Sequence, residues 1–225
     1  MKKIGFTAFI VALAIGSIFS ANCNSVGFGS LTGVRGSGNS KSETRNASGF
    51  KGIKAGGAVN VEVTAQKDYS VAVEADDNLL PYIKTEVSGD VLKIYTEDRI
   101  SSKSDINIKI SMPEINSADI SGASSAIISN VKTDSVKLET SGASKIKVNG
   151  EAKSLESKAS GASGIDAENL KAENANIEAS GASNTTVSAT NEVKADASGA
   201  STIYYAGNPK NVKQNSSGAS TIKKK

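Results

Sequence analysis

The chain has 225 residues, a length that allows one sizeable core or two small ones. It contains no Trp or His, only 4% aromatic residues and a single Cys, which excludes an internal disulfide and fits an ordered, aromatic-poor β protein. The formal net charge is +3, and it falls to +1 without Lys2 and Lys3, because 24 basic residues then face 23 acidic ones. This balance gives no support for nucleic-acid binding.

Residues 1–22 have the pattern of an export signal. Lys2 and Lys3 form a positively charged start, and an apolar stretch then runs from Ile4 to Phe19 and gives way to small residues. The stretch is short for a membrane span. We therefore predict a signal peptide over residues 1–22.

The single cysteine, Cys23, follows this segment directly, at the place where a bacterial lipoprotein carries its acylated cysteine. We therefore predict lipidation of Cys23, which would hold the protein on a membrane surface without a spanning segment. The preceding Ser20-Ala21-Asn22 departs from the usual Leu-(Ala/Ser)-(Gly/Ala) lipobox, and Asn22 is its least orthodox residue. Ordinary signal cleavage beside a free cysteine is the alternative.

Residues 23–46 are rich in Gly, Ser, Asn and basic residues and show no hydrophobic periodicity. This composition predicts a flexible tether that would lift the folded part of the protein clear of the membrane. The folded domain is expected to occupy residues 47–222, with a basic tail at 223–225.

Alternating apolar residues predict a series of strands over residues 47–115. Val59, Val61 and Val63, for example, alternate with polar residues. These strands lack the short motif that recurs over residues 116–222. We therefore expect them to form wider coils or a sheet that caps the repeats and covers an open strand edge.

The tetrapeptide Ser-Gly-Ala-Ser occurs six times in residues 116–222, at intervals of 20, 19, 20, 18 and 19 residues. A period this short indicates a solenoid in which each repeat is one coil that cannot bury its apolar side alone. Between the motifs, apolar and polar residues alternate with the period of two that is typical of strands. We predict an all-β fold, a single-stranded parallel β-helix with about six coils of 18–20 residues. The motifs begin at Ser121, Ser141, Ser160, Ser180, Ser198 and Ser217.

Alignment of the repeats on their glycines separates inward from outward positions. Residues two, four and six before each glycine are mostly apolar or small, and so are residues four and six after it. Each coil is therefore expected to contain two short strands separated by the motif. The inward residues include Val136, Leu138, Thr140, Leu155, Ser157, Ala159, Ala175, Ile177, Ala179, Val193, Ala195, Ala197, Ile146, Val148, Ile165, Ala167, Thr185, Val187, Ile203 and Tyr205.

The motif itself is interpreted as architecture. Stacked coils lie about 4.8 Å apart, so a sharp corner accepts only small residues or residues that tolerate positive φ. The serines are expected to bond backbone groups at the bend or to form a ladder with serines of neighbouring coils. The functional alternative is a flat polar array for a repetitive ligand such as a glycan or ice. The corner glycines are Gly122, Gly142, Gly161, Gly181, Gly199 and Gly218.

An enzyme has to be considered, because parallel β-helices include polysaccharide lyases and hydrolases. Stacked Glu178 and Asp196 would be neighbours that could bind a cation or act as a carboxylate pair. Solvated surface charges offset by Lys158 and Lys194 are the favoured interpretation. Tyr204, the outward member of the one aromatic cluster in the repeats, is interpreted as a surface residue of a strand. We expect no catalytic residue, no metal ligand and no cofactor.

The order of elements resembles a bacterial family, the putative auto-transporter adhesin, head GIN domain. The resemblance covers about residues 48–222 and rests on the Ser-Gly-Ala-Ser repeats together with a series of short runs before them. It implies an exported, often lipid-anchored β-helical domain of the cell envelope, and it supplies no catalytic residues. The runs are Gly49-Phe50-Lys51-Gly52-Ile53, Val59-Asn60-Val61-Glu62-Val63, Tyr69-Ser70-Val71, Asp76-Asp77-Asn78-Leu79-Leu80, Ile83-Lys84-Thr85-Glu86, Leu92-Lys93-Ile94 and Met112-Pro113-Glu114-Ile115.

These observations together predict a non-enzymatic, adhesin-like binding module of the cell envelope. We expect an outer-membrane lipoprotein that faces the periplasm or the cell exterior. Its expected partners are the membrane, through the lipid anchor, and a glycan or surface protein; nucleic acid is not expected. A structural scaffold of the envelope is the first alternative, and a carbohydrate-active enzyme is the second.

Overall fold

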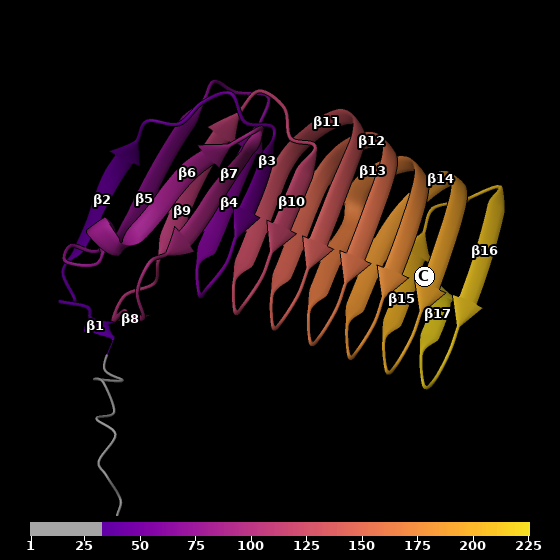
Figure 1. Ribbon diagram of the computed structural model, residues 1–225. Helices are drawn as coiled ribbons and strands as arrows, with labels where there is room; N and C mark the ends of the chain where they lie inside the picture. Colours follow the sequence, from indigo (N-terminus) through magenta and orange to yellow (C-terminus); the bar gives the residue numbers. More distant parts are fainter. Residues whose placement is uncertain (1–32) are drawn as a thin grey trace, which may run out of the picture. The chain divides into compact units, whose positions relative to one another are not determined.

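The computed structural model of the protein describes residues 33–225 (Figure 1). Within that range the regular elements are strands, apart from one turn of 3-10 helix, η1 (Leu80–Tyr82). Fifteen strands form one continuous sheet coiled into a solenoid, and β1 and β8 form a separate pair. The predicted all-β parallel solenoid is confirmed. The strands are β1 (Val34–Arg35), β2 (Ser40–Arg45), β3 (Gly52–Ala55), β4 (Asn60–Ala65), β5 (Ser70–Asp76), β6 (Ile83–Ser88), β7 (Val91–Thr96), β8 (Ile100–Ser101), β9 (Asn107–Met112), β10 (Ser117–Ile120), β11 (Ser125–Thr140), β12 (Lys145–Ala159), β13 (Gly164–Ala179), β14 (Asn184–Ala197), β15 (Thr202–Ala206), β16 (Asn211–Ser216) and β17 (Thr221–Lys224).

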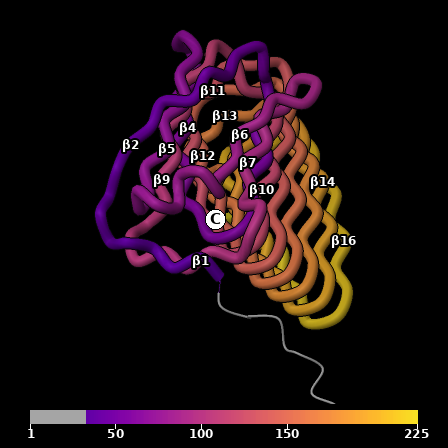
Figure 2. The backbone as a smooth tube through the Cα atoms, turned by 60° about the vertical axis from the view of Figure 1, so that its left-hand side comes forward, coloured from indigo at the N-terminus to yellow at the C-terminus, as the bar shows by residue number. Residues whose placement is uncertain are grey.

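The C-terminal repeats form a parallel stack. The strand order is β10, β11, β12, β13, β14, β15 and β17, and β16 lies beside β14. Equivalent positions of successive repeats are opposite each other, as Glu139, Lys158 and Glu178 are. Each residue therefore lies about 4.8 Å from its counterpart in the next coil. Figure 2, which views the stack obliquely, shows the coils superposed behind one another.

In β11 to β14 the strand that follows one corner is continuous with the strand that leads into the next, whereas β15 and β16 remain separate. β11 runs from one Ser-Gly-Ala-Ser corner to the next through a second bend, where Asn130 has a φ of 62°, and β12 bends at Gly150, with a φ of 133°. The pairing offset between β11 and β12 changes there, from 20 residues at Ile128–Val148 (148 − 128) to 19 at Val131–Gly150 (150 − 131). The second bend thus absorbs the variation in repeat length, while the corners stay in register.

The predicted inward residues of the repeats are buried, and the lysines, glutamates and asparagines between them mostly face solvent. This confirms the assignment of the two faces. In the described part of the chain, two hydroxyls of this core, Ser157 Oγ and Thr185 Oγ1, have no hydrogen-bond partner. A buried hydroxyl left without a partner costs about 1–3 kcal/mol.

Replacement of Thr185 by valine is therefore expected to stabilise the protein. Valine keeps the branched shape and removes the unsatisfied oxygen, so Thr185→Val should raise the free energy of unfolding by about 1 kcal/mol in urea denaturation. The adjacent Thr186 points outward, and Thr186→Val should change stability by less than about 0.5 kcal/mol. A lower stability of Thr185→Val than of the wild type would contradict the assignment.

The first coil, formed by β3 and β4, lies inside the stack rather than at its end. β3 pairs in parallel with β10 on one side and β7 on the other, and β4 pairs likewise with β11 and β9. The chain therefore leaves the stack after β4, returns to form an outer coil from β7 and β9, and then continues as β10 (Figure 1).

Antiparallel strands cap the outer coil. β6 pairs with β7, β5 pairs with β9, and β2 pairs with β5. The sequence predicted wider coils or a capping sheet over residues 47–115, and the structure contains both an outer coil and a cap. The cap satisfies backbone groups that an open parallel edge would leave exposed.

Part of the predicted flexible tether, residues 23–46, is ordered. β2 forms six antiparallel residue pairs with β5, from Ser40–Asp76 to Arg45–Val71, and β1 pairs with β8. β2 covers the sheet edge, and its residues are mostly exposed. It is ordered mainly because its backbone pairs with β5, and such pairing produces no hydrophobic periodicity in the sequence. The predicted signal peptide and Cys23 lie outside the described residues. Between residues 33 and 225, no helix has the length and apolar character needed to cross a membrane.

Candidate functional site

The six corner glycines share one geometry. Their φ values lie between 72° and 78°, a region that side chains disfavour. A Cβ atom on Gly161 would lie 2.8 Å from the carbonyl oxygen of Gly142, and the same oxygen accepts a 2.8 Å hydrogen bond from the N–H of Ala162. Successive corner backbones therefore stack directly on one another and leave room only for hydrogen.

A further corner is present at Gly56-Gly57-Ala58-Val59. Gly57 has a φ of 105°, and its carbonyl oxygen accepts a 2.7 Å hydrogen bond from the N–H of Ala123. The sequence analysis missed this corner because it contains no serine. The Gly-Ala pair directly before the alternating Val59 was the available signal.

The last serine of each motif bonds the backbone rather than another serine. Ser144 Oγ donates to the carbonyl oxygens of Ile120 and Ser141, both at 2.8 Å, and Ser201 Oγ donates to that of Ala179 at 3.1 Å. The last serine of the motif is buried at most corners, whereas the glycine and alanine are exposed. The last serines of the motifs therefore present no array of free hydroxyls to a ligand.

We use the term pre-corner face for the surface formed by the outward side chains of the strand segments that lead into a corner. Glu178 and Asp196 lie opposite each other on it and line an open hollow of 250 Å³. Lys158 pairs with Glu178 at 3.2 Å, but Lys194 pairs with Glu192 instead. Among residues 33–225, no group of three His, Cys, Asp or Glu side chains is placed to hold a metal ion.

Other charges of the pre-corner face are also paired. Lys54 contacts Asp119 at 2.7 Å, and hydrogen bonding to this carboxylate raises the pKa of Lys54. Lys137 contacts Glu139 at 3.1 Å and Glu156 at 3.7 Å, and the hydrogen bond to Glu139 is the main cause of its raised pKa. This face thus largely neutralises its own charges.

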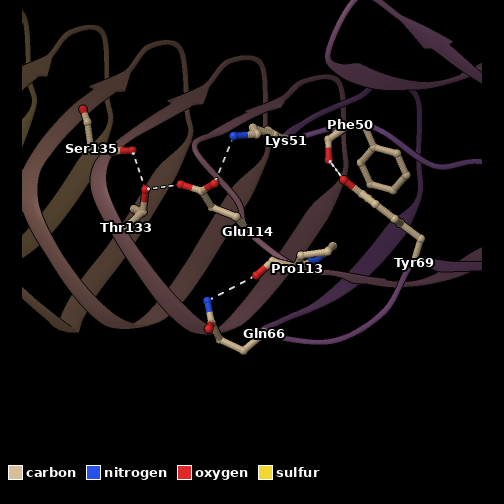
Figure 3. Close-up of polar contacts among 8 residues, drawn as sticks. All are labelled: Phe50, Lys51, Gln66, Tyr69, Pro113, Glu114, Thr133 and Ser135. Atoms are coloured by element: carbon tan, nitrogen blue, oxygen red, sulfur yellow. Dashed lines mark hydrogen bonds and ion pairs between the residues drawn. The ribbon is translucent and has the colours of Figure 1, made fainter.

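A hollow of 550 Å³ lies over the second bends and is lined mostly by paired charges, although Lys132 and Glu173 take part in none of the ion pairs of residues 33–225. Asp134 contacts Lys153 at 2.7 Å. Glu114 accepts hydrogen bonds from Lys51 at 3.1 Å and from Thr133 at 3.2 Å (Figure 3). These contacts tie the segment after β9 to β11, and we assign them a structural role.

Two further contacts beside Glu114 fasten the first coil to the cap and the outer coil (Figure 3). The Tyr69 hydroxyl donates to the carbonyl oxygen of Phe50 at 3.0 Å, and the two ring centroids are 5.0 Å apart. Gln66 Nε2 donates to the carbonyl oxygen of Pro113 at 3.2 Å. The junction is therefore a packed polar and aromatic contact.

Asp76 is a fully buried carboxylate in the cap. It accepts hydrogen bonds from Lys103 N at 2.8 Å, Ser104 Oγ at 2.8 Å, Ser102 Oγ at 3.0 Å and Gly38 N at 3.1 Å. The Lys103 N–H contributes most to lowering the pKa of Asp76 to about 2, the two hydroxyls lower it further, and burial opposes them. Asp76 holds together two loops of the cap.

We use the term post-corner face for the surface formed by the outward side chains of the strand segments that follow a corner. Two outward columns cross this face in register. The first column is Asn107, Asn60, Ser125, Lys145, Gly164, Asn184, Thr202 and Thr221, and the second is Lys109, Glu62, Ile127, Lys147, Asp166, Thr186, Tyr204 and Lys223.

Two adjoining hollows lie on the post-corner face. The Gly164 hollow, of 780 Å³, is lined by residues of the coils around Gly164, and the Asn60 hollow, of 320 Å³, lies between Asn60 and Lys109. Ser125 and Ile127 line both hollows. We take this pair of hollows as the candidate binding site. The sequence analysis did not single out its residues, although the column alignment shows Gly164 as the one position of the first column without a side chain.

The tyrosines of β15 are oriented as predicted. Tyr205 is buried in the core and accepts a 3.2 Å hydrogen bond from Gln214 Nε2, whereas Tyr204 is exposed in the second column of the post-corner face. Tyr204 lies two coils beyond Asp166, outside the residues that line the Gly164 hollow.

The fold defines the class of protein, a parallel β-solenoid with one capped end and stacked glycine corners. Within that class, the chain belongs to the family described as putative auto-transporter adhesin, head GIN domain, whose model matches residues 49–209. This confirms the resemblance found in the sequence. No curated protein matches the chain.

Several solved structures share the fold. A putative adhesin from Bacteroides fragilis is 22% identical, with a TM-score of 0.72 over 86% of this chain and 100% of that one. A putative adhesin from Parabacteroides merdae is 20% identical, with a TM-score of 0.56 over 85% and 98% of the two chains. A putative lipid binding protein from Parabacteroides distasonis is 21% identical, with a TM-score of 0.51 over 84% and 99%. At these identities the likeness establishes the fold.

Proposed function

We propose that the protein is an exported, lipid-anchored module of the cell envelope that binds a partner and catalyses no reaction. The observation that carries this proposal is the post-corner face, where two registered columns of outward side chains surround two adjoining hollows. Most charged groups of the pre-corner face and of the hollow over the second bends pair with one another. The post-corner face is therefore the surface best suited to a partner.

The location in the envelope is supported by the family, whose description is putative auto-transporter adhesin, and by residues 1–23 of the sequence. A positively charged start, an apolar stretch and then Cys23 fit an exported lipoprotein. We propose that the anchor lies in the outer membrane and that the domain faces the periplasm or the cell exterior.

Two other functions rank lower. A structural scaffold of the envelope would need the stacked corners but not the hollows of the post-corner face. A carbohydrate-active enzyme would need a carboxylate pair, and the only pair considered, Glu178 and Asp196, is exposed and partly neutralised by Lys158.

The anchor is tested by intact mass and protease accessibility of the protein in its native cells. We expect the wild type to carry acyl mass at Cys23 and to be cleaved by protease added to whole cells, and we expect Cys23→Ala to lack the acyl mass and to leave the membrane fraction. Asn22→Gly, which restores the usual lipobox residue, is the matched control and should remain acylated. A wild-type protein without acyl mass would contradict lipidation, and an acylated protein shielded from protease would favour the scaffold role.

A further inference from the structure

The Gly164 hollow exists because one residue of a strand lacks a side chain. The neighbours of Gly164 in the adjacent coils are Lys145 and Asn184. Gly164 has no positive φ, and a Cβ atom there would come no closer than 3.5 Å to another atom, the carbonyl oxygen of Asn184. The backbone therefore does not require glycine here, in contrast to the corners. Glycine inside a strand often marks a place where a ligand approaches closely.

The hollow also contains an ammonium group without an acidic partner. Lys147 is paired with Asp166 at 3.8 Å. Lys145, next to Gly164, takes part in none of the ion pairs found among residues 33–225. A carboxylate or another anionic group on a ligand would complement the charge of Lys145.

The wall between the two hollows is apolar. Ile127 is 52% exposed, the largest exposure among the large hydrophobic residues of the described chain. Beyond it, the Asn60 hollow contains amides and hydroxyls in a network: Ser125 Oγ donates to Asn60 Oδ1 at 2.8 Å, and Asn60 Nδ2 donates to Asn107 Oδ1 at 3.2 Å. An apolar patch between such polar groups suits a ring that has C–H groups on its face and hydroxyls at its edge.

The size of the site fits a ligand of several rings. Volumes of 780 Å³ and 320 Å³ fall within the range of about 300–1,000 Å³ that is usual for ligand sites. Because the hollows adjoin at Ser125 and Ile127, a chain molecule could occupy both. The Asn60 hollow is lined by Glu62 and Glu74 but by only one lysine, Lys109. Because its two carboxylates would repel an anion, an anionic group of the ligand is favoured at the other end of the site, beside Lys145.

From these features we infer that the post-corner face binds an acidic glycan. One sugar ring lies over Gly164 with its carboxylate paired with Lys145, the next ring packs against Ile127, and the neutral part of the chain extends toward Asn60. This inference rests on the proposed binding function and specifies its ligand class. It assigns Lys145 as a binding residue and Gly164 as the residue that makes space for the sugar.

Isothermal titration calorimetry with an oligosaccharide of neutral sugars that carries one terminal galacturonate tests the inference. We expect the wild type to bind, Lys145→Gln to weaken binding at least about tenfold, as the loss of a charged hydrogen bond implies, and Gly164→Leu to abolish it by filling the hollow. Lys171→Gln, which removes the same charge from the hollow over the second bends, should bind like the wild type. The methyl ester of the same oligosaccharide has the same chain without its charge and should bind at least about tenfold more weakly.

Binding of the esterified and acidic chains with equal affinity would overturn the acidic class of ligand. Equal binding by Lys145→Gln and the wild type would overturn the site, even if Gly164→Leu failed to fold. Absence of binding to the acidic oligosaccharide would overturn the glycan, and binding instead to phosphatidylglycerol vesicles that Lys145→Gln weakens would replace it by a lipid surface. Failure of the glycan inference can be distinguished from failure of the proposed envelope location, because acylation and protease accessibility on cells are measured without the glycan.

Discussion

Substitution of the corner residue Gly161 by alanine is expected to lower the free energy of unfolding by about 3 kcal/mol. The left-handed conformation at φ 76° costs an alanine about 1–2 kcal/mol, and overpacking in a tight site costs about 1–3 kcal/mol more. The added Cβ would lie 2.8 Å from the backbone oxygen of Gly142, which is held by its hydrogen bond to Ala162 and cannot easily move away. The midpoint of thermal unfolding should fall by about 6–12 °C.

Gly164→Ala is a matched control three residues along the same coil. Its backbone is compatible with a side chain and its Cβ has room, so this variant should be more stable than the wild type by about 0.5–1 kcal/mol. Urea denaturation of the two variants beside the wild type measures both effects. Equal stability of the two variants would show that the corner geometry does not require glycine.

The contrast between these glycines shows what the sequence could predict. The repeated Gly in Ser-Gly-Ala-Ser marks each corner in the sequence. The strand period of two on either side of that glycine then identifies the residues that point inward. Gly57 escaped notice because its corner has no serine. The sequence analysis did not single out Gly164, and its role emerges only when Lys145, Gly164 and Asn184 are placed in register on one face.

The order of the first coils could not be predicted from periodicity. Ile53 pairs with Leu92 on one side and Ala118 on the other, so the coil that comes first in the chain lies second in the stack. Apolar alternation identifies strands but does not choose among partners that are far apart in sequence. β2 lacked even this signal, because its residues are mostly exposed and its backbone pairs with β5 without burying an apolar face.

Asp76 was likewise visible only in the structure. Its sequence neighbours, Asp77 and Asn78, are exposed, and nothing in the acidic run distinguishes the one buried carboxylate. Its donors come from two distant loops, one containing Gly38 and the other Lys103. These bonds form in the folded protein and favour the ionised carboxylate, which links the stability of the cap to pH.

The stability contributed by Asp76 is expected to be lost in acid. The folded pKa of about 2 lies below the ordinary value of 3.8, so the contribution is complete above about pH 4 and declines as the pH falls toward 2. Asp76→Asn removes the charge and turns an amide N–H₂ group toward the donors that surround Asp76. The urea midpoint of this variant should therefore be lower than that of the wild type at pH 7. The two midpoints should converge as the pH falls from 4 to about 2. Asp134→Asn, at a surface carboxylate that is 84% exposed, should leave the midpoint nearly unchanged at every pH. A gap between Asp76→Asn and the wild type that stayed constant on acidification would show that the lost stability comes from altered packing and not from the ionised carboxylate.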